Sequence, residues 1–374
     1  MVLLKNNRIL TSFGVFIAIV LLLTGCNTPY YRLHVAVDPP AAVEVVGLEA
    51  GYPENKVAQF ELAIRDGYRL KEWIGPNKPT ETKDGKWEIS MTNHMFLEVV
   101  FEHIDDLLLK AIMGENQSEV KSLIAEGAEV NATSRHGRKS LLMTAVETNK
   151  DPSVAKILIE AGADAKARDN DGKTALMYAV TNNSNPEFVK LLLKSGINVD
   201  SRDKKGKTAL MYAAEFNDNF AVVETLLNAG ADFEARSESQ GWTALTYAIE
   251  GNGGYETIST LLAKSKVDVN ELQSHGRTLL MQAAESNQNP QVIKALVDRG
   301  ANIDKPDNRG RTALMYAALS NPNPEVVLML LELGADGSLR SQDGWTAFDY
   351  AGDNYRVKNN DVYWMLNDAR FLQK

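Results

Sequence analysis

Two kinds of hydrophobic spacing divide this chain. From about residue 105 onward, apolar residues recur at i, i+3 and i+4 in short segments, as in Val189, Leu192 and Leu193, which predicts amphipathic helices. Between residues 31 and 104, apolar and polar residues alternate in short runs, which predicts strands. The clearest such runs are Leu33–Val37, Phe60–Ile64 and Phe96–Phe101. We therefore expect a multidomain chain: a small all-β domain of five or six strands over 31–104, then an all-α region over 105–374.

The helical region is a tandem repeat. The phrase Thr-Ala-Leu-Met-Tyr-Ala, or a variant of it, begins at Ser140, Thr174, Thr208, Thr243, Thr278, Thr312 and Thr346, at spacings of 34, 34, 35, 35, 34 and 34 residues. A fixed period of this size indicates a stacked array whose units contact mainly their neighbours and leave a long surface. In each unit the threonine is expected to cap a first helix, and pairs such as Asn185-Pro186 to begin a second. The residues after Gly196 and its equivalents then run out as a projecting finger.

This helix–turn–helix–finger order, with Thr-Ala-Leu and Gly230-Ala231-Asp232, resembles the ankyrin repeat. The resemblance implies a solenoid of about eight helix–turn–helix repeats over 105–374, with 105–138 and 346–374 as atypical end caps. The family's proline after the threonine is alanine here, and its histidine is usually methionine, so apolar packing is expected to replace a Thr–His hydrogen bond. In the last cap, Val362, Met365 and Leu366 are expected to pack inward, and Asp361, Asn367, Asp368 and Arg370 to form a polar outer face.

In ankyrin proteins, partners usually bind the concave side formed by fingertips and first helices. Carried over by position, the residues that follow each finger glycine are Arg138, Lys173, Lys207, Trp242, Arg277, Arg311 and Trp345. Arg and Trp often anchor interfaces, so this strip is a candidate partner-binding surface; the alternative is a set of solvated fingertips. The tyrosine column on the first helices comprises Tyr178, Tyr212, Tyr247, Tyr316 and Tyr350. It either lines the concave floor or packs between repeats with only its hydroxyls exposed.

The N-terminus has the pattern of an export signal. Lys5 and Arg8 precede an apolar run from Ile9 to Leu23, too short for a comfortable membrane span. The following Leu23-Thr24-Gly25-Cys26 resembles the lipobox of bacterial lipoproteins. The resemblance implies that residues 1–25 are removed and that Cys26 is lipidated, with 26–30 as a linker. Asn27 then favours the outer membrane facing the periplasm, with the inner membrane or cell surface as other sites. An uncleaved anchor helix is the alternative.

The strand region has its own resemblance. Gly67–Gly75, the expected strand near Trp87–Met91 and the closing run to Phe101 resemble the divergent internalin B-type repeat of bacterial surface proteins. The family's glycine-rich early turn is replaced here by Pro39-Pro40. Such modules are spacers or adhesion units. Trp73 and Trp87 are either core residues or a platform for stacking sugars.

Composition narrows the chemistry. The chain has 374 residues and a formal net charge of −9, which becomes −11 without Lys5 and Arg8, so general nucleic-acid binding is not expected. Cys26 is the single cysteine. No P-loop, nucleophile elbow or dinucleotide fingerprint is present, so we expect no enzyme and no cofactor. Asp169-Asn170-Asp171-Gly172 opens like a calcium loop, but Val180 stands where the bidentate glutamate is needed, so we expect a finger turn and no metal site.

Together these patterns favour a membrane-anchored envelope lipoprotein whose ankyrin array is a protein–protein interaction scaffold for unidentified envelope proteins. The alternative is a glycan or peptidoglycan binder acting through the β-domain. A third possibility is a tether for acidic polymers through the basic strip, with salt-sensitive binding.

Overall fold

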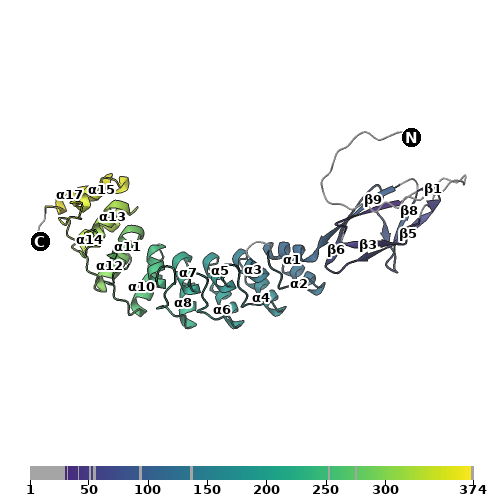
Figure 1. The fold of residues 1–374 in the computed structure, drawn as a ribbon, viewed down its shortest axis with the longest axis horizontal. Coiled ribbons are helices and arrows are strands. Elements are labelled where there is room, and N and C mark those ends of the chain that lie inside the picture. The colour runs from purple at the N-terminus through teal and green to yellow at the C-terminus, as the bar shows by residue number, and fades with distance from the viewer. Residues whose placement is uncertain are drawn as a thin grey trace. The chain divides into compact units, whose positions relative to one another are not determined.

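The computed structural model describes residues 30–31, 33–40, 42–49, 52–53, 56–91, 95–134, 138–251, 253–273 and 276–371 (Figure 1). By internal contacts these residues divide into two units. One contains the described residues up to Ala111 together with Ser118–Glu129, and the other contains Ile112–Gln117 and the described residues from Val130 onward. The expected order, a small β region followed by a helical region, is confirmed.

The strands of the first unit form two main sheets and one short pair. The order in one sheet is β2-β9-β6, with β2 parallel and β6 antiparallel to β9, and in the other it is β3-β5-β8-β7. The two-residue strands β1 and β4 pair with each other. The bounds are β1 Tyr30–Tyr31, β2 Leu33–Asp38, β3 Val43–Val46, β4 Tyr52–Pro53, β5 Val57–Ile64, β6 Tyr68–Ile74, β7 Thr80–Glu81, β8 Trp87–Ser90 and β9 Met95–His103.

Period-two alternation builds the core between these strands. Along β9, Met95, Leu97, Val99 and Phe101 are buried, while Phe96 points outward and is exposed. Buried residues of β5, β6 and β8 join the same cluster, among them Phe60, Trp73 and Ile89. The predicted runs at 33–37, 60–64 and 96–101 each lie inside a strand.

Helix α1 (Ile104–Met113) follows β9 directly, and α2 (Gln117–Ala125) comes next. Within the first unit, Arg69 of β6 pairs with Glu119 of α2 at 3.2 Å, and Lys110 of α1 lies 3.6 Å from Glu102 of β9. These side chains are partly exposed, so each ion pair contributes little to stability by itself. Buried Leu108 and Leu123 supply the apolar packing of the two helices.

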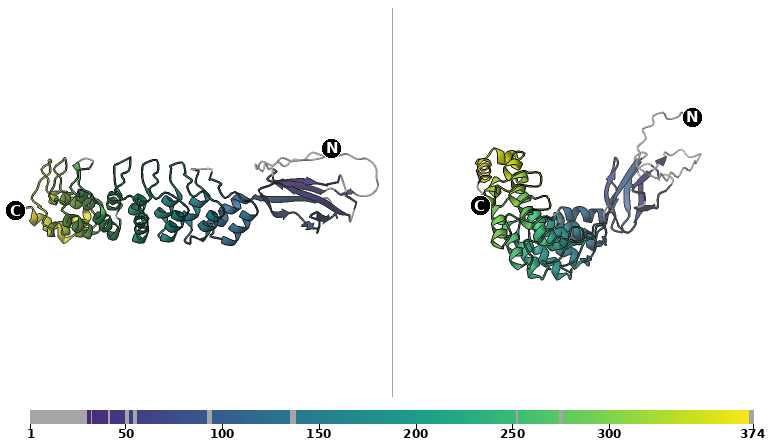
Figure 2. Two further views of the ribbon diagram at one scale, coloured as in Figure 1. Left: turned by 90° about the horizontal axis from the view of Figure 1, so that it is seen from below. Right: turned by 60° about the vertical axis from the view of Figure 1, so that its left-hand side comes forward.

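In the second unit, helix pairs stack in two rows, and the fingers extend from one side of the stack (Figure 2). The first-row helices are α3 Leu141–Thr148, α5 Ala175–Asn182, α7 Ala209–Phe216, α9 Ala244–Glu250, α11 Leu279–Ser286, α13 Ala313–Ser320 and α15 Ala347–Ala351. The second-row helices are α4 Ser153–Glu160, α6 Pro186–Lys194, α8 Phe220–Asn228, α10 Tyr255–Lys264, α12 Pro290–Asp298, α14 Pro324–Glu332 and α17 Asp361–Ala369. The short α16 (Tyr355–Lys358) precedes α17.

Local sequence fixes where these helices begin. The Thr174 hydroxyl accepts a hydrogen bond from the backbone N–H of Met177, and Asn185 caps α6 with Pro186 in its first turn, as predicted. The methionine that replaces the family's histidine is buried, as expected from Met packing. The sulfur of Met211 also lies 3.5 Å from the backbone nitrogen of Thr208.

Buried asparagines join successive repeats, a role that the sequence reasoning missed. Asn321 is fully buried, and its Nδ2 donates at 2.9 Å to the carbonyls of Ala284 and Asn287 in the preceding repeat. Its Oδ1 accepts the N–H of Asn323 at 2.8 Å. Such bonds satisfy backbone groups that stacking removes from water. We call this set the amide ladder; the side chains that donate to the preceding repeat are Asn183, Asn217, Asn287, Asn321 and Asn354.

The ladder is interrupted between α9 and α10. Glycines stand there instead, and a Cβ added at Gly253 would lie only 2.8 Å from the Ala214 carbonyl oxygen. Backbone thus packs directly on backbone, which only glycine permits. On the far side of this junction, Asn287 Nδ2 donates to the Ile249 carbonyl at 3.5 Å, a longer contact than either bond of Asn321 to the preceding repeat.

At the C-terminal end one expectation is wrong. Met365 is 44% exposed, and neighbouring Trp364 is 63% exposed, while Val362 and Leu366 are buried. The helix presents Val362 and Leu366 to the preceding repeat, which turns Met365 outward. The outer face of α17 is therefore partly apolar. In the described part of the chain, no helix combines the length and the apolarity needed to cross a membrane.

Replacing Asn321 with alanine should destabilise the array by roughly 2–4 kcal/mol, because two buried carbonyls and one N–H lose their partners. Urea unfolding followed by circular dichroism measures the change. Asn170→Ala is the matched control, since Asn170 is exposed in a finger and should change stability by less than about 0.5 kcal/mol. Equal stabilities for the two variants would contradict a structural role for the ladder.

Candidate interaction surface

Each finger is tied to the first helix that follows it. In the finger before α7, Asp203 Oδ1 accepts the backbone N–H groups of Lys205 and Lys207, both at 2.8 Å. Its Oδ2 accepts the hydroxyl of Tyr212 at 2.7 Å. One buried carboxylate therefore fixes both the turn and the tyrosine. Two other fingers repeat the arrangement, with Asp169–Tyr178 and Asp307–Tyr316, each at 2.8 Å. The sequence Asp169–Gly172 is accordingly a finger turn, closed by the Gly172 N–H on the Asp169 carbonyl.

Burial and these hydrogen bonds set the protonation states. Burial, followed by the bond to Asp307, raises the pKa of Tyr316 to about 12. The pKa values of Tyr178 and Tyr212 are also raised, first by burial and then by their aspartates. For Asp307, burial alone would raise the pKa, but bonds from the Arg311 N–H and the Tyr316 hydroxyl outweigh it and lower the pKa. At neutral pH the tyrosines therefore remain donors and Asp307 a carboxylate.

Four basic residues of the predicted strip, Lys173, Lys207, Arg277 and Arg311, lie against tyrosine rings of the first helices. Lys207 is 7% exposed, pairs with Glu215, and places its Nζ 4.4 Å from the Tyr212 ring centre and 4.1 Å from that of Tyr247. Lys173 Nζ lies 5.0 Å from the ring of Tyr212 in the next repeat. The strip therefore links neighbouring repeats through cation–π contacts.

Arg277 and Arg311 share one ring. Both guanidinium carbons lie 4.5 Å from the ring centre of Tyr316, with Arg277 paired to Glu285 and Arg311 paired to Asp307 at 3.2 Å. Their side chains are only 22% and 21% exposed. A large part of the predicted basic strip is thus engaged inside the array.

The aromatic and end members of the strip differ in exposure. Trp242 packs edge-on against Tyr247 at 5.3 Å, and Trp345 lies at the same distance from Tyr350, but Trp345 remains 46% exposed. Arg138 is exposed at the other end of the strip. The structure favours packing between repeats for the tyrosine column, since Tyr212, Tyr247, Tyr316 and Tyr350 are 7% exposed or less. Their hydroxyls are not free in solvent but bonded to Asp203, Ser237, Asp307 and Ser341. Whether the strip binds a partner stays a prediction.

A column of finger arginines was also missed. Arg168 Nη1 donates to the carbonyls of Gly172 and Arg202, at 2.8 and 2.6 Å, and Arg202 bonds Gly206 and Arg236 in the same way. Each guanidinium thus closes its own finger and ties it to the next. The sequence signal was an arginine four residues before a finger glycine at the repeat spacing.

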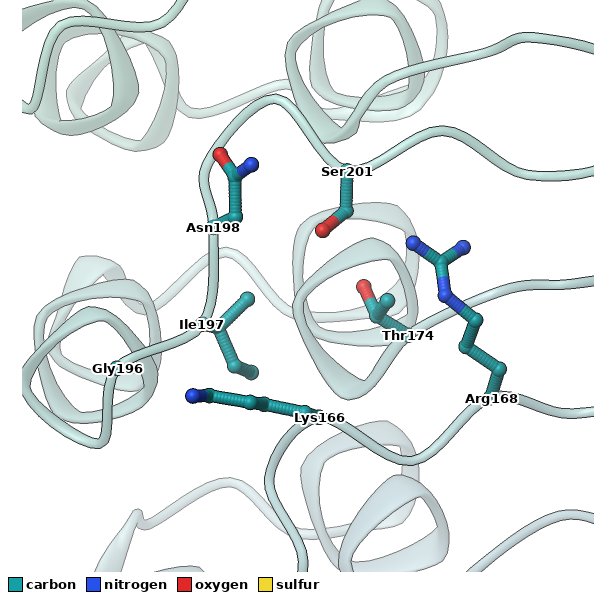
Figure 3. Close-up of a pocket in the computed structure, with 7 residues that line it drawn as sticks. All are labelled: Lys166, Arg168, Thr174, Gly196, Ile197, Asn198 and Ser201. Carbon is teal, nitrogen blue, oxygen red and sulfur yellow. The ribbon is translucent and has the colours of Figure 1, made fainter.

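A shallow cavity of about 320 Å³ lies at the base of two adjacent fingers (Figure 3). Its walls carry two cationic side chains, two hydroxyls and an amide. The lining residues are Lys166, Arg168, Thr174, Gly196, Ile197, Asn198 and Ser201.

In the β region, Trp73 is 9% exposed and its ring centre lies 5.1 Å from that of Trp87 and 5.9 Å from that of Phe60. The structure thus supports the core interpretation of this pair over a sugar platform. Cys26 and the apolar run Ile9–Leu23 lie outside the described residues, so lipidation stays a prediction. Within the described residues, no cluster of His, Cys, Asp and Glu is arranged to hold a metal ion.

Paired helices in two rows, with fingers bonded from repeat to repeat, define a helical solenoid of the interaction class. Four overlapping segments, 107–203, 185–273, 252–343 and 280–370, match the family model described as Ankyrin repeats (3 copies). Together they span more than half of the chain, which therefore belongs to the ankyrin-repeat family. Ankyrin repeats suggest a protein–protein interaction role and imply protein partners in general, and ankyrin-repeat proteins are generally non-enzymatic scaffolds.

Two curated relatives share a short stretch with this chain. The mitochondrial disaggregase of Homo sapiens is 41% identical over 66 residues, which is 18% of this chain and 9% of that protein. The mitochondrial disaggregase of Bos taurus is 39% identical over 66 residues, 18% of this chain and 10% of that protein. The chain therefore spans about a tenth of the length of these relatives.

Replacing Asp307 with asparagine should lower stability at pH 7 by about 2 kcal/mol, because Tyr316 and Arg311 lose a charged acceptor. The folded-state pKa of Asp307 is lowered, so its contribution is complete above the unfolded-chain value of about 4 and is lost as the pH falls. Calorimetric Tm values from pH 7 to 2.5 should therefore converge for wild type and variant at the acidic end. Asp171→Asn, on an exposed finger aspartate, should follow wild type throughout. A constant offset for Asp307→Asn at every pH would count against this role of the carboxylate.

Proposed function

We propose that this chain is an envelope lipoprotein, anchored through acyl chains on Cys26, whose ankyrin array docks one or more envelope proteins. The observation that supports docking is the fixed geometry of the fingers. A carboxylate such as Asp203 holds the turn and the tyrosine, and an arginine such as Arg202 bonds the next finger. Loops held in this way lose little conformational entropy when a partner binds, which favours affinity.

The exposed parts of the fingers offer the contacts. Trp345 is half exposed, and Arg138 is exposed at the opposite end of the array. Between them, exposed cations stand on the fingers of a chain whose net charge is −9, which favours a partner with acidic groups at the interface. The exposed finger cations are Arg168, Arg202, Lys204, Lys205, Arg236, Arg309 and Arg340.

The anchor is proposed from the sequence of the first 26 residues. Each buried CH₂ contributes about 0.8 kcal/mol, and stable attachment takes more than one acyl chain, as bacterial lipoproteins carry. Asn27 after the cysteine favours the outer membrane, facing the periplasm, as the site of anchoring. The array would then be held close to proteins of the same envelope, which raises their effective concentration.

The docking proposal is tested by photo-crosslinking in intact bacteria with the probe in the finger before α15. Trp345→Ala together with Arg138→Ala should reduce the captured envelope protein at least about tenfold, since exposed Trp and Arg anchors dominate interfaces. Trp364→Ala is the matched control, because Trp364 is also exposed but lies on α17 outside the fingers. Equal loss in both variants, or none in either, would reject the finger surface.

The anchoring proposal is tested separately. Cys26→Ser should abolish incorporation of an alkynyl fatty acid into the chain and release it from the membrane fraction after cell lysis, because the sulfur that carries the lipid is gone. Wild-type chain should label and sediment with outer-membrane markers. Cys26→Ser chain that still labels, or that stays with the membrane after carbonate washing, would contradict lipid anchoring at this residue.

A further inference from the structure

The bases of successive fingers are joined by a recurring hydrogen bond. At four junctions, a side chain at the base of one finger accepts the backbone N–H of the residue 32 or 33 positions further on, in the following finger. Asp200 Oδ1 accepts the N–H of Asp232 at 2.9 Å, and Asp304 Oδ1 accepts that of Asp336 at 2.8 Å. The same bond joins Asn131 to Asp164 at 2.7 Å and Asn270 to Asn302 at 2.8 Å. The acceptor is in every case a planar carboxylate or amide oxygen.

One junction breaks this rule. Lys166 occupies the acceptor position between Asn131 and Asp200, and the N–H that it should serve is that of Asn198. Lysine carries three donors and no acceptor, so it cannot replace the missing oxygen. Among the described residues, the Asn198 N–H and the Lys166 ammonium have no hydrogen-bond or ion-pair partner. At this junction two donors therefore line one cavity without the acceptor oxygen that other junctions supply.

The cavity of about 320 Å³ lies at this junction, as Figure 3 shows. Lys166 runs along Gly196, with its Cε 3.8 Å from where a Cβ of that glycine would stand. Arg168 forms the opposite wall, held there by its bonds to the carbonyls of Gly172 and Arg202. No carboxylate is among the lining residues, so the positive charge of this cavity is not neutralised from within its walls.

We propose that this cavity binds a carboxylate side chain, Asp or Glu, of the protein partner; this deepens the proposed docking function and rests on it. The partner's carboxylate takes the place that Asp200 or Asp304 fills at other junctions. It accepts the N–H of Asn198 and pairs with the Lys166 ammonium, and the Arg168 guanidinium adds a second positive charge. Hydrogen bonds between ionised groups are about twice as strong as neutral ones, so one such contact would orient the partner along the fingers.

The recurring geometry is why a carboxylate is the proposed ligand. The neighbouring junctions show that a planar oxygen on a short side chain fits this place and reaches the backbone N–H at 2.7–2.9 Å. The partner's carboxylate would thus accept the Asn198 N–H, as a side-chain oxygen of the array accepts the equivalent N–H at other junctions.

The test uses full-length chain in detergent and two capped heptapeptides, one alternating glutamate with glycine and its twin with glutamine. Calorimetry measures binding, and hydrogen–deuterium exchange with fragmentation measures protection at the Asn198 amide. Wild type should bind the glutamate peptide with protection of Asn198, and the glutamine twin should bind at least about tenfold more weakly. Inorganic phosphate is the second arm, for a free anion.

Lys166→Asp supplies the missing oxygen from within the chain. It should protect the Asn198 amide without any peptide and weaken glutamate-peptide binding at least about tenfold. Lys194→Asp is the matched control, since it makes the same change in charge at an exposed site on α6 that does not line the cavity. Lys166→Gln, which is neutral, gives the same comparison if the aspartate variant does not fold.

Three results would overturn the proposal: no saturable binding of the glutamate peptide, equal weakening by Lys166→Asp and Lys194→Asp, or phosphate binding as tightly as the peptide. If crosslinked partners are still captured in cells while the peptide fails, this cavity is rejected and docking through the fingers stands. If the peptide binds at Asn198 but no envelope protein is captured through the fingers, the docking function is rejected instead.

Discussion

The array depends on satisfying backbone groups that stacking buries. Each repeat hides the carbonyls of the turn between its helices against its neighbour, and those groups lose water. The amide ladder supplies the partners. Asn217 donates to the carbonyls of Val180 and Asn183, and Asn321 donates to those of Ala284 and Asn287. Apolar contacts alone would leave these groups unpaired at a cost of about 1–3 kcal/mol each. These bonds therefore hold neighbouring repeats in one register, and this register also fixes the spacing of the fingers.

The fingers are held in the same way, by polar side chains that each satisfy several partners. Asp203 serves two backbone donors and a tyrosine hydroxyl, while Lys207 lies between two tyrosine rings and pairs with Glu215. Most of the basic residues that the sequence predicted as a contact strip instead make contacts within the array and hold the fingers in place. The outer edges of the fingers carry exposed cations, and the junction that carries Lys166 lacks the acceptor oxygen found at other described junctions. The membership in the ankyrin-repeat family agrees with a surface built in this way.

The sequence predicted the fold well because its signals are local. The threonine caps, the Asn-Pro starts and the period-two runs each depend on residues close together in the chain. The burial of Lys207 and Arg277 could not be predicted, because it depends on tyrosines in the next repeat and glutamates eight residues on. The ladder asparagines recur at the repeat spacing, which could have revealed their role. They stand in polar turns, however, where an asparagine is normally expected to be exposed to solvent. Met365 was misplaced because helical spacing alone does not say which neighbour a terminal helix faces.

The glycine junction between α9 and α10 bears on how the array would respond to a pulling force. Asn217 and Asn321 each donate two side-chain hydrogen bonds to the preceding repeat, whereas at this junction glycine backbone lies against the carbonyl of Ala214. If the array is pulled along its length, we expect the repeats to separate first at this junction, because the amide side chains that join other repeats are replaced there by glycine. The repeats on the two sides of the junction would then unfold as two separate cooperative blocks.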